Sequence, residues 1–233
     1  MAQKDGKRKN GGSHRTESAF EGGHRNGAEL AGGKSITKVP VIGLTGGIAS
    51  GKTTVAHFFK KWGACVISGD ELGWRVLKDK SVQKKLVLMF GPEITSKGKI
   101  DRKVLGPKVF ANKGTLGRFN RIVHPPLLAL LKGEVVQTHK KKCKAIVIDA
   151  ALLAEWKIPV KLDFLLMVHA PKKVQLKRQM NKGLTRAQAL RRIRSQMSYR
   201  QRRKVSDGVL VNSGSVMELR RKAKSVWHKV VSG

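Results

Sequence analysis

The sequence is poor in acidic and in aromatic residues, and both shortages limit what the protein can bind. Asp and Glu number 15 among 233 residues, against 49 Lys and Arg, so the formal net charge is +34. A charge of this size attracts polyanions, which makes nucleic acid, an acidic membrane surface and phosphate-rich small molecules candidate partners. Aromatic residues make up 5% of the chain and offer few platforms on which bases could stack. Because the basic residues are spread along the whole chain, we expect no dedicated nucleic-acid partner.

Long apolar runs and clusters of metal-binding residues are also missing. No run of about eighteen apolar residues occurs, and the first residues lack the apolar stretch of a secretory signal. We therefore predict a cytoplasmic protein without a membrane partner, and we expect a monomer. The two cysteines, Cys65 and Cys143, have no second Cys or His at the spacing of metal ligands. This pattern predicts two buried, reduced thiols and no zinc site.

The composition divides the chain into an extension and one domain. Residues 1–38 are rich in Gly, Ser, Asn and Lys and lack a periodic apolar pattern, which predicts a disordered, basic extension. Residues 39–233 contain short apolar runs that alternate with helical patterns, and this alternation predicts an α/β domain with a doubly wound parallel sheet. The alternative for the extension is a transit peptide, in which acidic side chains are unusual. The acidic residues of this segment are Asp5, Glu17, Glu21 and Glu29.

The expected elements follow from the spacing of the apolar residues. The strands should be the apolar runs at 39–44, 64–68, 145–149, 164–168 and 208–211. Apolar residues at spacing three or four predict helices over 55–63, 72–89, 102–110, 116–133, 172–180, 186–199 and 216–230.

One segment matches the P-loop pattern of nucleotide-binding proteins in full. Its glycines let the backbone curl so that N–H groups hold phosphate oxygens, and the loop ends at a helix N-terminus that favours the same anion. Lys52 is expected to reach the β- and γ-phosphates of ATP, and the Thr53 hydroxyl to bind Mg²⁺. An apolar strand precedes the segment and a helical pattern follows it, as the motif requires. The predicted nucleotide-binding residues are Gly46, Gly47, Ile48, Ala49, Ser50, Gly51, Lys52, Thr53 and Thr54.

Two aspartates follow predicted strands and should lie at the edge of the sheet where ligands bind. Asp70 comes after the second strand, where a carboxylate could accept the proton of an attacking hydroxyl; the alternative is a helix N-cap. Asp149 ends the third strand, the usual setting for an acid that holds Mg²⁺ directly or through water; the alternative is a turn residue.

The stretch 172–204 is predicted to form a basic lid. No acidic residue occurs between Asp163 and Asp207, so this segment should close onto an anion. A guanidinium supplied by a closing lid is a common way to stabilise charge on a transferring phosphoryl group, and Arg178 is a candidate. The alternative for most of these side chains is a plain solvated helix.

Taken together, these motifs resemble the dephospho-coenzyme A kinase family over about Val41 to Trp227. The P-loop is shared with many kinases, whereas the ordered series of shorter motifs is specific. Where the family usually has two aspartates after the second strand, this chain has Ser68 and Asp70. The stretches that carry the resemblance are 43–56, 66–70, 101–102, 109–110, 122–125, 148–155, 196, 206–207 and 211–214.

The resemblance implies a P-loop kinase core with a helical acceptor-binding region over 71–140 and a lid over 172–204. The implied reaction is phosphorylation of the ribose 3′-hydroxyl of dephospho-coenzyme A by MgATP, the last step of coenzyme A biosynthesis. By the same resemblance Asp70 would be catalytic together with Lys52, Arg178 would belong to the lid, and Asn212 would lie near the adenine. The residues that would shape the acceptor pocket are Asp70, His124, Leu152, Leu153 and Glu155.

Two alternative functions remain open at this point. The first is another small-molecule kinase of the same fold, with a nucleotide or a sugar as acceptor. The second is a basic nucleic-acid-binding protein that uses ATP only as a structural ligand, which the charge of +34 would suit. In the second case basic residues should gather on one face away from the P-loop.

Overall fold

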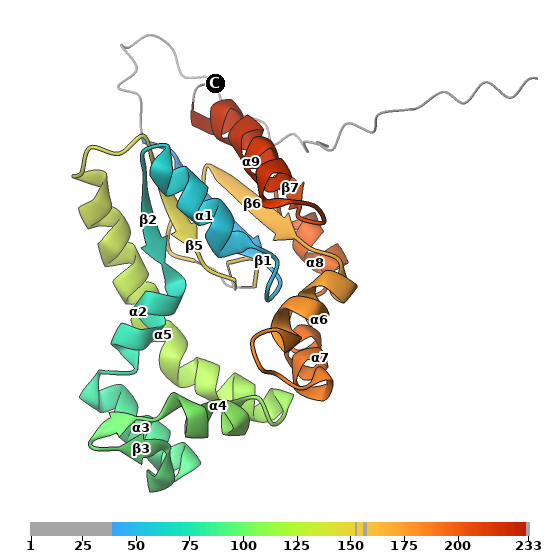
Figure 1. Cartoon of the computed structure of the whole chain (residues 1–233). Helices are drawn as coiled ribbons and strands as arrows, with labels where there is room; N and C mark the ends of the chain where they lie inside the picture. The colour runs from blue at the N-terminus through green and yellow to red at the C-terminus, as the bar shows by residue number, and fades with distance from the viewer. Residues whose placement is uncertain (1–38, 152, 156–157, 232–233) are drawn as a thin grey trace, which may run out of the picture.

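The computed structural model describes residues 39–151, 153–155 and 158–231. The predicted extension 1–38 therefore lies outside the described residues. The centre of the domain is a parallel sheet of five strands in the order β2-β5-β1-β6-β7, which confirms the predicted α/β fold (Figure 1). The strands are β1 (Val41–Gly46), β2 (Ala64–Ser68), β5 (Ala145–Asp149), β6 (Phe164–His169) and β7 (Gly208–Val211).

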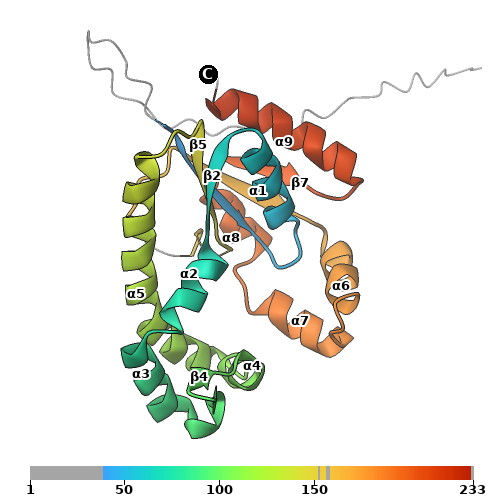
Figure 2. The same ribbon diagram turned by 60° about the vertical axis from the view of Figure 1, so that its left-hand side comes forward.

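Every residue of the two central strands, β1 and β5, is buried, as their nearly continuous apolar sequences predicted. Helices cover both faces of the sheet (Figures 1 and 2). Helices α1 (Lys52–Lys61) and α9 (Val216–Val231) pack on one face with Ile42, and the rings of Phe59 and Trp227 lie 5.2 Å apart there. Val41 points to the opposite core, because successive side chains of a strand alternate between faces.

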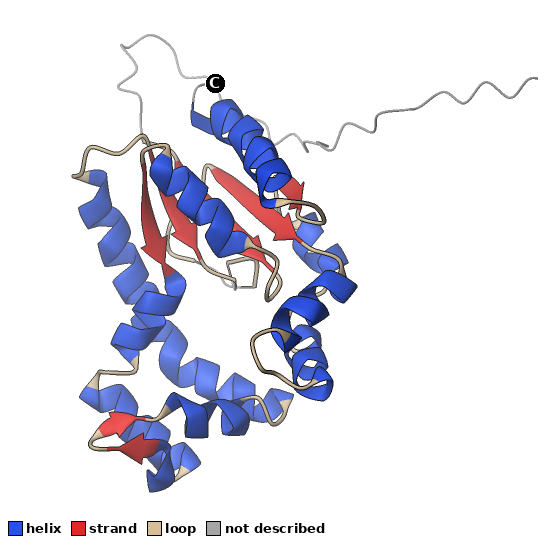
Figure 3. Cartoon of the chain, in the orientation of Figure 1, coloured by secondary structure: helices blue, strands red, loops and turns tan. Residues whose placement is uncertain are grey.

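The opposite core belongs to a helical region between β2 and β5. Asp79 splits the helix predicted over 72–89 into two, because its carboxylate accepts the Ser81 and Val82 N–H groups and caps a new helix. A short antiparallel hairpin that the sequence did not predict lies between α3 and α4, whose bounds follow (Figure 3). The elements of this region are α2 (Gly69–Val76), α3 (Lys80–Phe90), the 3₁₀ turn Pro92–Ile94, β3 (Thr95–Ser96), β4 (Lys99–Ile100), α4 (Arg102–Val109) and α5 (Lys113–His139).

Three short helices connect β6 to β7: α6 (Lys172–Met180), α7 (Arg186–Arg194) and α8 (Tyr199–Lys204). The helix predicted over 186–199 ends early, because Ser198 and Gln201 form a capping box that starts α8. None of the helices in the described residues is long and apolar enough to cross a membrane.

The prediction of two buried, reduced thiols is wrong. Cys65 of β2 and Cys143, which precedes β5, form a disulfide with their Cα atoms 5.7 Å apart, and both residues are only half-buried. The two strands are parallel neighbours, so their first residues lie side by side although 78 positions separate the cysteines. The bond therefore joins the two ends of the chain segment that contains α2 to α5.

Candidate active site

The P-loop lies between β1 and α1, where the sequence placed it. Ala49 and Gly51 have φ angles of 57° and 98°, in the left-handed region that non-glycine residues rarely adopt. Close packing also excludes a side chain at two glycines: a Cβ on Gly46 would lie 2.3 Å from the Val168 carbonyl oxygen, and one on Gly51 would lie 2.2 Å from Nδ2 of Asn212. Since α1 begins directly after the loop, its positive end borders the loop amides.

Lys52 and Asp149 form an ion pair at the start of α1. The Lys52 Nζ lies 2.5 Å from Oδ1 of Asp149, and the side chains are only 14% and 8% exposed. Asp149 is the last residue of β5 and pairs in register with Ser68, so the alternative of a turn residue is wrong. Thr53 is the next residue of α1 and is exposed.

The described residues contain no cluster of three or more His, Cys, Asp or Glu side chains that could hold a metal ion by themselves. A hydroxyl and one carboxylate, such as those of Thr53 and Asp149, are nevertheless the kind of ligands that Mg²⁺ takes in kinases, because phosphate oxygens and waters supply the others.

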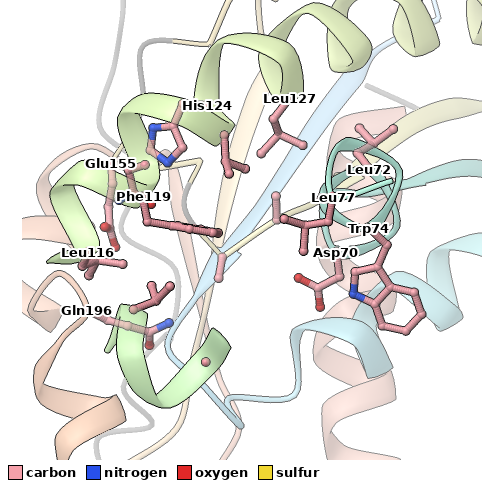
Figure 4. A pocket seen from close by; sticks show the side chains of 18 of the residues that line it. Asp70, Leu72, Trp74, Leu77, Leu116, Phe119, His124, Leu127, Glu155 and Gln196 are labelled. Atoms are coloured by element: carbon pink, nitrogen blue, oxygen red, sulfur yellow. The ribbon is translucent and has the colours of Figure 1, made fainter. Parts of the chain in front are cut away.

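Asp70 is the second residue of α2 and is exposed. The N-cap of this helix is Ser68, whose hydroxyl accepts the Glu71 N–H at 3.2 Å, so the alternative of Asp70 as a cap is wrong. The start of α2 packs tightly on the turn after β5, since a Cβ on Gly69 would lie 2.6 Å from that of Ala150. The Asp70 carboxylate points into a cavity (Figure 4).

We name this cavity the acceptor cavity. It has a volume of about 660 Å³ and reaches from Ile48 of the P-loop to α4 and α5. Its walls are mostly apolar. His124 belongs to them, and burial lowers the pKa of its imidazole, which keeps the ring neutral at pH 7. Of the residues predicted to shape the acceptor pocket, Asp70, His124, Leu153 and Glu155 line this cavity, and Leu152 lies outside the described residues.

Two side chains connect the cavity to the predicted lid. The Glu155 carboxylate accepts the Met197 N–H and a guanidinium N–H of Arg202, both at 3.2 Å, and Arg202 is only 3% exposed. Oε1 of Gln196 accepts the N–H of Ile48 in the P-loop at 2.7 Å. Sequence reasoning assigned no role to Gln196 beyond its place in the resemblance.

Arg178 and Asn212 both contact the backbone of the P-loop. The Arg178 guanidinium donates to the carbonyl oxygen of Ala49 at 3.0 Å, and the Asn212 amide donates to that of Ser50 at 2.7 Å. The two side chains also meet, since Arg178 donates to Oδ1 of Asn212 at 3.3 Å. The structure thus brings both beside the loop from α6 and from the end of β7.

Sequence reasoning missed several residues of the cavity wall. Trp74 was detectable, since it follows Asp70 by four positions and so shares its face of α2. Phe119, Arg102 and Arg192 come from other helices, and no local pattern relates them to Asp70, although Arg102 lies in a stretch that carries the resemblance and Arg192 in the predicted lid. All four line the acceptor cavity.

The sequence model of the dephospho-CoA kinase family matches residues 40–218 of this chain. The chain belongs to the dephospho-CoA kinase family. Curated dephospho-CoA kinases similar to it include one from Latilactobacillus sakei, 37% identical over 191 residues, which spans 81% of this chain and 95% of that protein. Another, from Carboxydothermus hydrogenoformans, is 37% identical over 194 residues and spans 82% of this chain and 94% of its own length.

Solved structures agree with membership of the dephospho-CoA kinase family. The dephospho-CoA kinase from Campylobacter jejuni superposes with a TM-score of 0.56 at 25% identity, over 84% of this chain and 100% of that one. The Thermus thermophilus protein TT1252 superposes with a TM-score of 0.68 at 32% identity, over 83% of this chain and 99% of that one. All the site residues predicted from the sequence lie inside the range that matches the dephospho-CoA kinase family.

Proposed function

We propose that this member of the family transfers the γ-phosphoryl group of ATP to the ribose 3′-hydroxyl of dephospho-coenzyme A. The products are coenzyme A and ADP, and the reaction is the last step of coenzyme A biosynthesis. The observation that carries the proposal is that one cavity is lined both by Ile48 of the P-loop and by Asp70. A phosphate donor on the loop and a hydroxyl in the cavity would therefore meet beside this carboxylate.

The nucleotide would be held by the P-loop, residues 46–54. The tight turns at Ala49 and Gly51 fit this use, because they allow successive backbone N–H groups to face one anion. Lys52 would bind phosphate oxygens, and Arg178 would stabilise the loop from α6. Asn212 would support it from the end of β7, near the adenine. Thr53 and Asp149 would hold Mg²⁺, which when bound neutralises charge on the phosphates.

Asp70 would act as the general base of the transfer. The 3′-oxygen attacks the γ-phosphorus and forms the new P–O bond, while the proton of the hydroxyl passes to the Asp70 carboxylate. The bond between the γ-phosphorus and the β–γ bridging oxygen breaks, and its electron pair leaves with ADP. The Asp70 carboxylate is exposed at the cavity wall, so a bound acceptor can reach it.

His124, Leu152, Leu153 and Glu155 would shape the pocket for dephospho-coenzyme A, with 71–140 as the acceptor-binding region and 172–204 as the lid. A cavity with mostly apolar walls suits a long acceptor with an apolar arm better than it suits a sugar. We further propose that the enzyme acts as a monomer in the cytoplasm, without a nucleic-acid or membrane partner.

Replacing Asp70 with Asn tests the role of the base. With dephospho-coenzyme A and MgATP, Asp70→Asn should lower kcat by roughly 10²–10⁴, while the affinity for ATP stays the same. The control is Glu71→Gln, which removes the neighbouring exposed carboxylate outside the cavity and should leave kcat unchanged. A near-normal kcat in Asp70→Asn contradicts the role of Asp70 as the base.

A panel of acceptors that adds adenosine, AMP and gluconate to dephospho-coenzyme A tests the identity of the substrate, with ADP release as the readout.

A further inference from the structure

A second cavity lies beside the acceptor cavity and is basic where the first is apolar. Its volume is about 760 Å³, and we call it the basic cavity. It shares Arg102, Gly106 and Arg192 with the acceptor cavity, so the two meet at these residues. Lys99 and Lys103 add two more cations to its lining. A ligand that extends from the acceptor cavity would therefore enter a cationic environment.

The two shared arginines have their charges available to a ligand. Both side chains are exposed, and neither forms an ion pair with a carboxylate in the part of the chain that the structure describes. The acid in the lining, Asp101, is engaged as the N-cap of α4, where its carboxylate accepts the Lys103 N–H at 2.8 Å. The lining of the basic cavity thus carries four cations, Lys99, Arg102, Lys103 and Arg192, against the one carboxylate of Asp101.

The position of Arg102 is set relative to Asp70 through Trp74. Asp70 and Trp74 are separated by one turn on the same face of α2, a rise of roughly 6 Å, and both line the acceptor cavity (Figure 4). The Arg102 guanidinium lies over the Trp74 ring, 3.9 Å from its centroid. This contact holds a flexible cation at a defined place in the wall of the cavity that Asp70 also lines.

We propose that Arg102 and Arg192 bind the diphosphate of the acceptor and so determine acceptor specificity. This inference rests on the proposed function. In dephospho-coenzyme A the diphosphate is attached to the 5′-oxygen of the same ribose whose 3′-hydroxyl reacts. When that hydroxyl is at Asp70, the diphosphate lies on the other side of the sugar, where it would meet a cation elsewhere in the lining of the same cavity, such as Arg102. Guanidinium groups suit this task because their fork of N–H donors matches phosphate oxygens.

The two arginines approach from opposite sides of the site. Arg102 begins α4 in the acceptor-binding region, whereas Arg192 belongs to α7 in the lid region, and these helices face one another in both views (Figures 1 and 2). A diphosphate between them would contact both regions at once. The acceptor itself would then stabilise the arrangement in which the site is covered, and an acceptor without the diphosphate would not.

Kinetics with single variants test the inference. Arg102→Ala and Arg192→Ala should each raise the KM for dephospho-coenzyme A by about 10–100-fold, the usual effect of losing a charged hydrogen bond, with the KM for ATP unchanged. Adenosine has the ribose but no diphosphate, so its inhibition constant against dephospho-coenzyme A should be the same in the variants and the wild type. Arg220→Ala removes an equally exposed charge from α9, far from both cavities, and should behave as the wild type.

The outcomes separate this inference from the proposed function. If the wild type does not phosphorylate dephospho-coenzyme A, the proposed function fails, and the inference fails with it. The inference is overturned if the wild type is active and either variant keeps its KM for dephospho-coenzyme A. It is also overturned if a variant weakens the binding of adenosine as much as that of dephospho-coenzyme A. Arg102→Lys keeps the charge but loses the fork, so it should recover only part of the affinity and guards against a failure of Arg102→Ala to fold. Thermal melting of each variant checks the fold.

Discussion

Lys52 pairs with a carboxylate in the structure and would also meet the phosphates of ATP in the proposed function. Its ammonium pairs with Asp149, and both side chains are largely buried. In the proposed function the same ammonium contacts the phosphates of ATP. There it would stabilise the negative charge of the phosphoryl group during its transfer. A lysine between a fixed carboxylate and the nucleotide can donate hydrogen bonds to both, since an ammonium has three donors.

Lys52→Ala should therefore abolish phosphoryl transfer while the protein remains folded. Loss of a charge that stabilises the transition state costs at least about 10²-fold in kcat/KM. Steady-state kinetics with dephospho-coenzyme A and far-UV circular dichroism check the two parts of this expectation. Wild-type activity in a folded variant would contradict the assignment of the P-loop as the ATP site.

At the scale of single residues the sequence predicted the conformation of the P-loop well and the residues of the cavity wall poorly. The loop residues are contiguous, and their glycine spacing encodes the local backbone that Ala49 and Gly51 adopt. The wall around Asp70 combines side chains from α2, α4, α5 and α7, such as Trp74 and Arg192, which only tertiary packing brings together. Spacing along the chain carries no information about such a set.

Among the secondary-structure elements, the central strands β1, β5 and β6 were predictable because they are almost fully buried. Short, nearly continuous apolar runs are typical of strands inside a parallel sheet. The helix ends were less predictable. Asp79 and Ser198 begin new helices, although the apolar spacing continues across both positions. A polar residue in such a pattern is equally compatible with the exposed face of one long helix. Strands of two residues, such as Thr95–Ser96, are too short to show an alternation.

The contact between α8 and the turn after β5 gives a prediction at this scale. Arg202 is 3% exposed, and the carboxylate of Glu155 is its ion-pair partner. Glu155→Ala leaves a buried guanidinium without that partner, so the free energy of unfolding should fall by about 3 kcal/mol. The matched control is Glu134→Ala, which breaks the exposed pair with Arg75 and should cost less than about 1 kcal/mol.

Urea unfolding at neutral pH measures both variants. The comparison removes the same kind of side chain twice. Glu155→Ala leaves a buried arginine and the Met197 N–H without their acceptor, whereas Glu134→Ala leaves an exposed arginine. Equal losses in Glu155→Ala and Glu134→Ala would show that the Arg202 pair contributes no more than a surface pair.

For the molecule as a whole, the excess of basic residues has a consequence for specificity. With 49 Lys and Arg and 15 Asp and Glu, most cations must remain without an acidic partner, so exposed arginines are available at many places. Charge alone would then attract any anion to many sites. A selective site needs cations at fixed positions, and the packing of Arg102 on Trp74 supplies one beside the acceptor cavity.

The disulfide is the covalent feature that acts on the whole domain. The segment between Cys65 and Cys143 contains α2 to α5, including Asp70 and most of the wall of the acceptor cavity. Both ends of this segment enter the sheet as neighbouring strands, which hydrogen bonds already hold together in the folded state. The bond therefore changes the folded state little and restricts mainly the unfolded chain.

Reduction of the Cys65–Cys143 bond should therefore lower the free energy of unfolding by about 2–4 kcal/mol without unfolding the domain. The reason is the loop of 78 positions that the bond closes, since loops of this length lose much of their entropy in the cross-linked unfolded state. Urea unfolding with and without prior reduction measures the difference. A variant with Ser at both positions should match the reduced protein and should not respond to the reductant. An unchanged urea midpoint after complete reduction would mean that the bond contributes nothing to stability, and that the packing of β2 on β5 alone holds the helical region to the sheet.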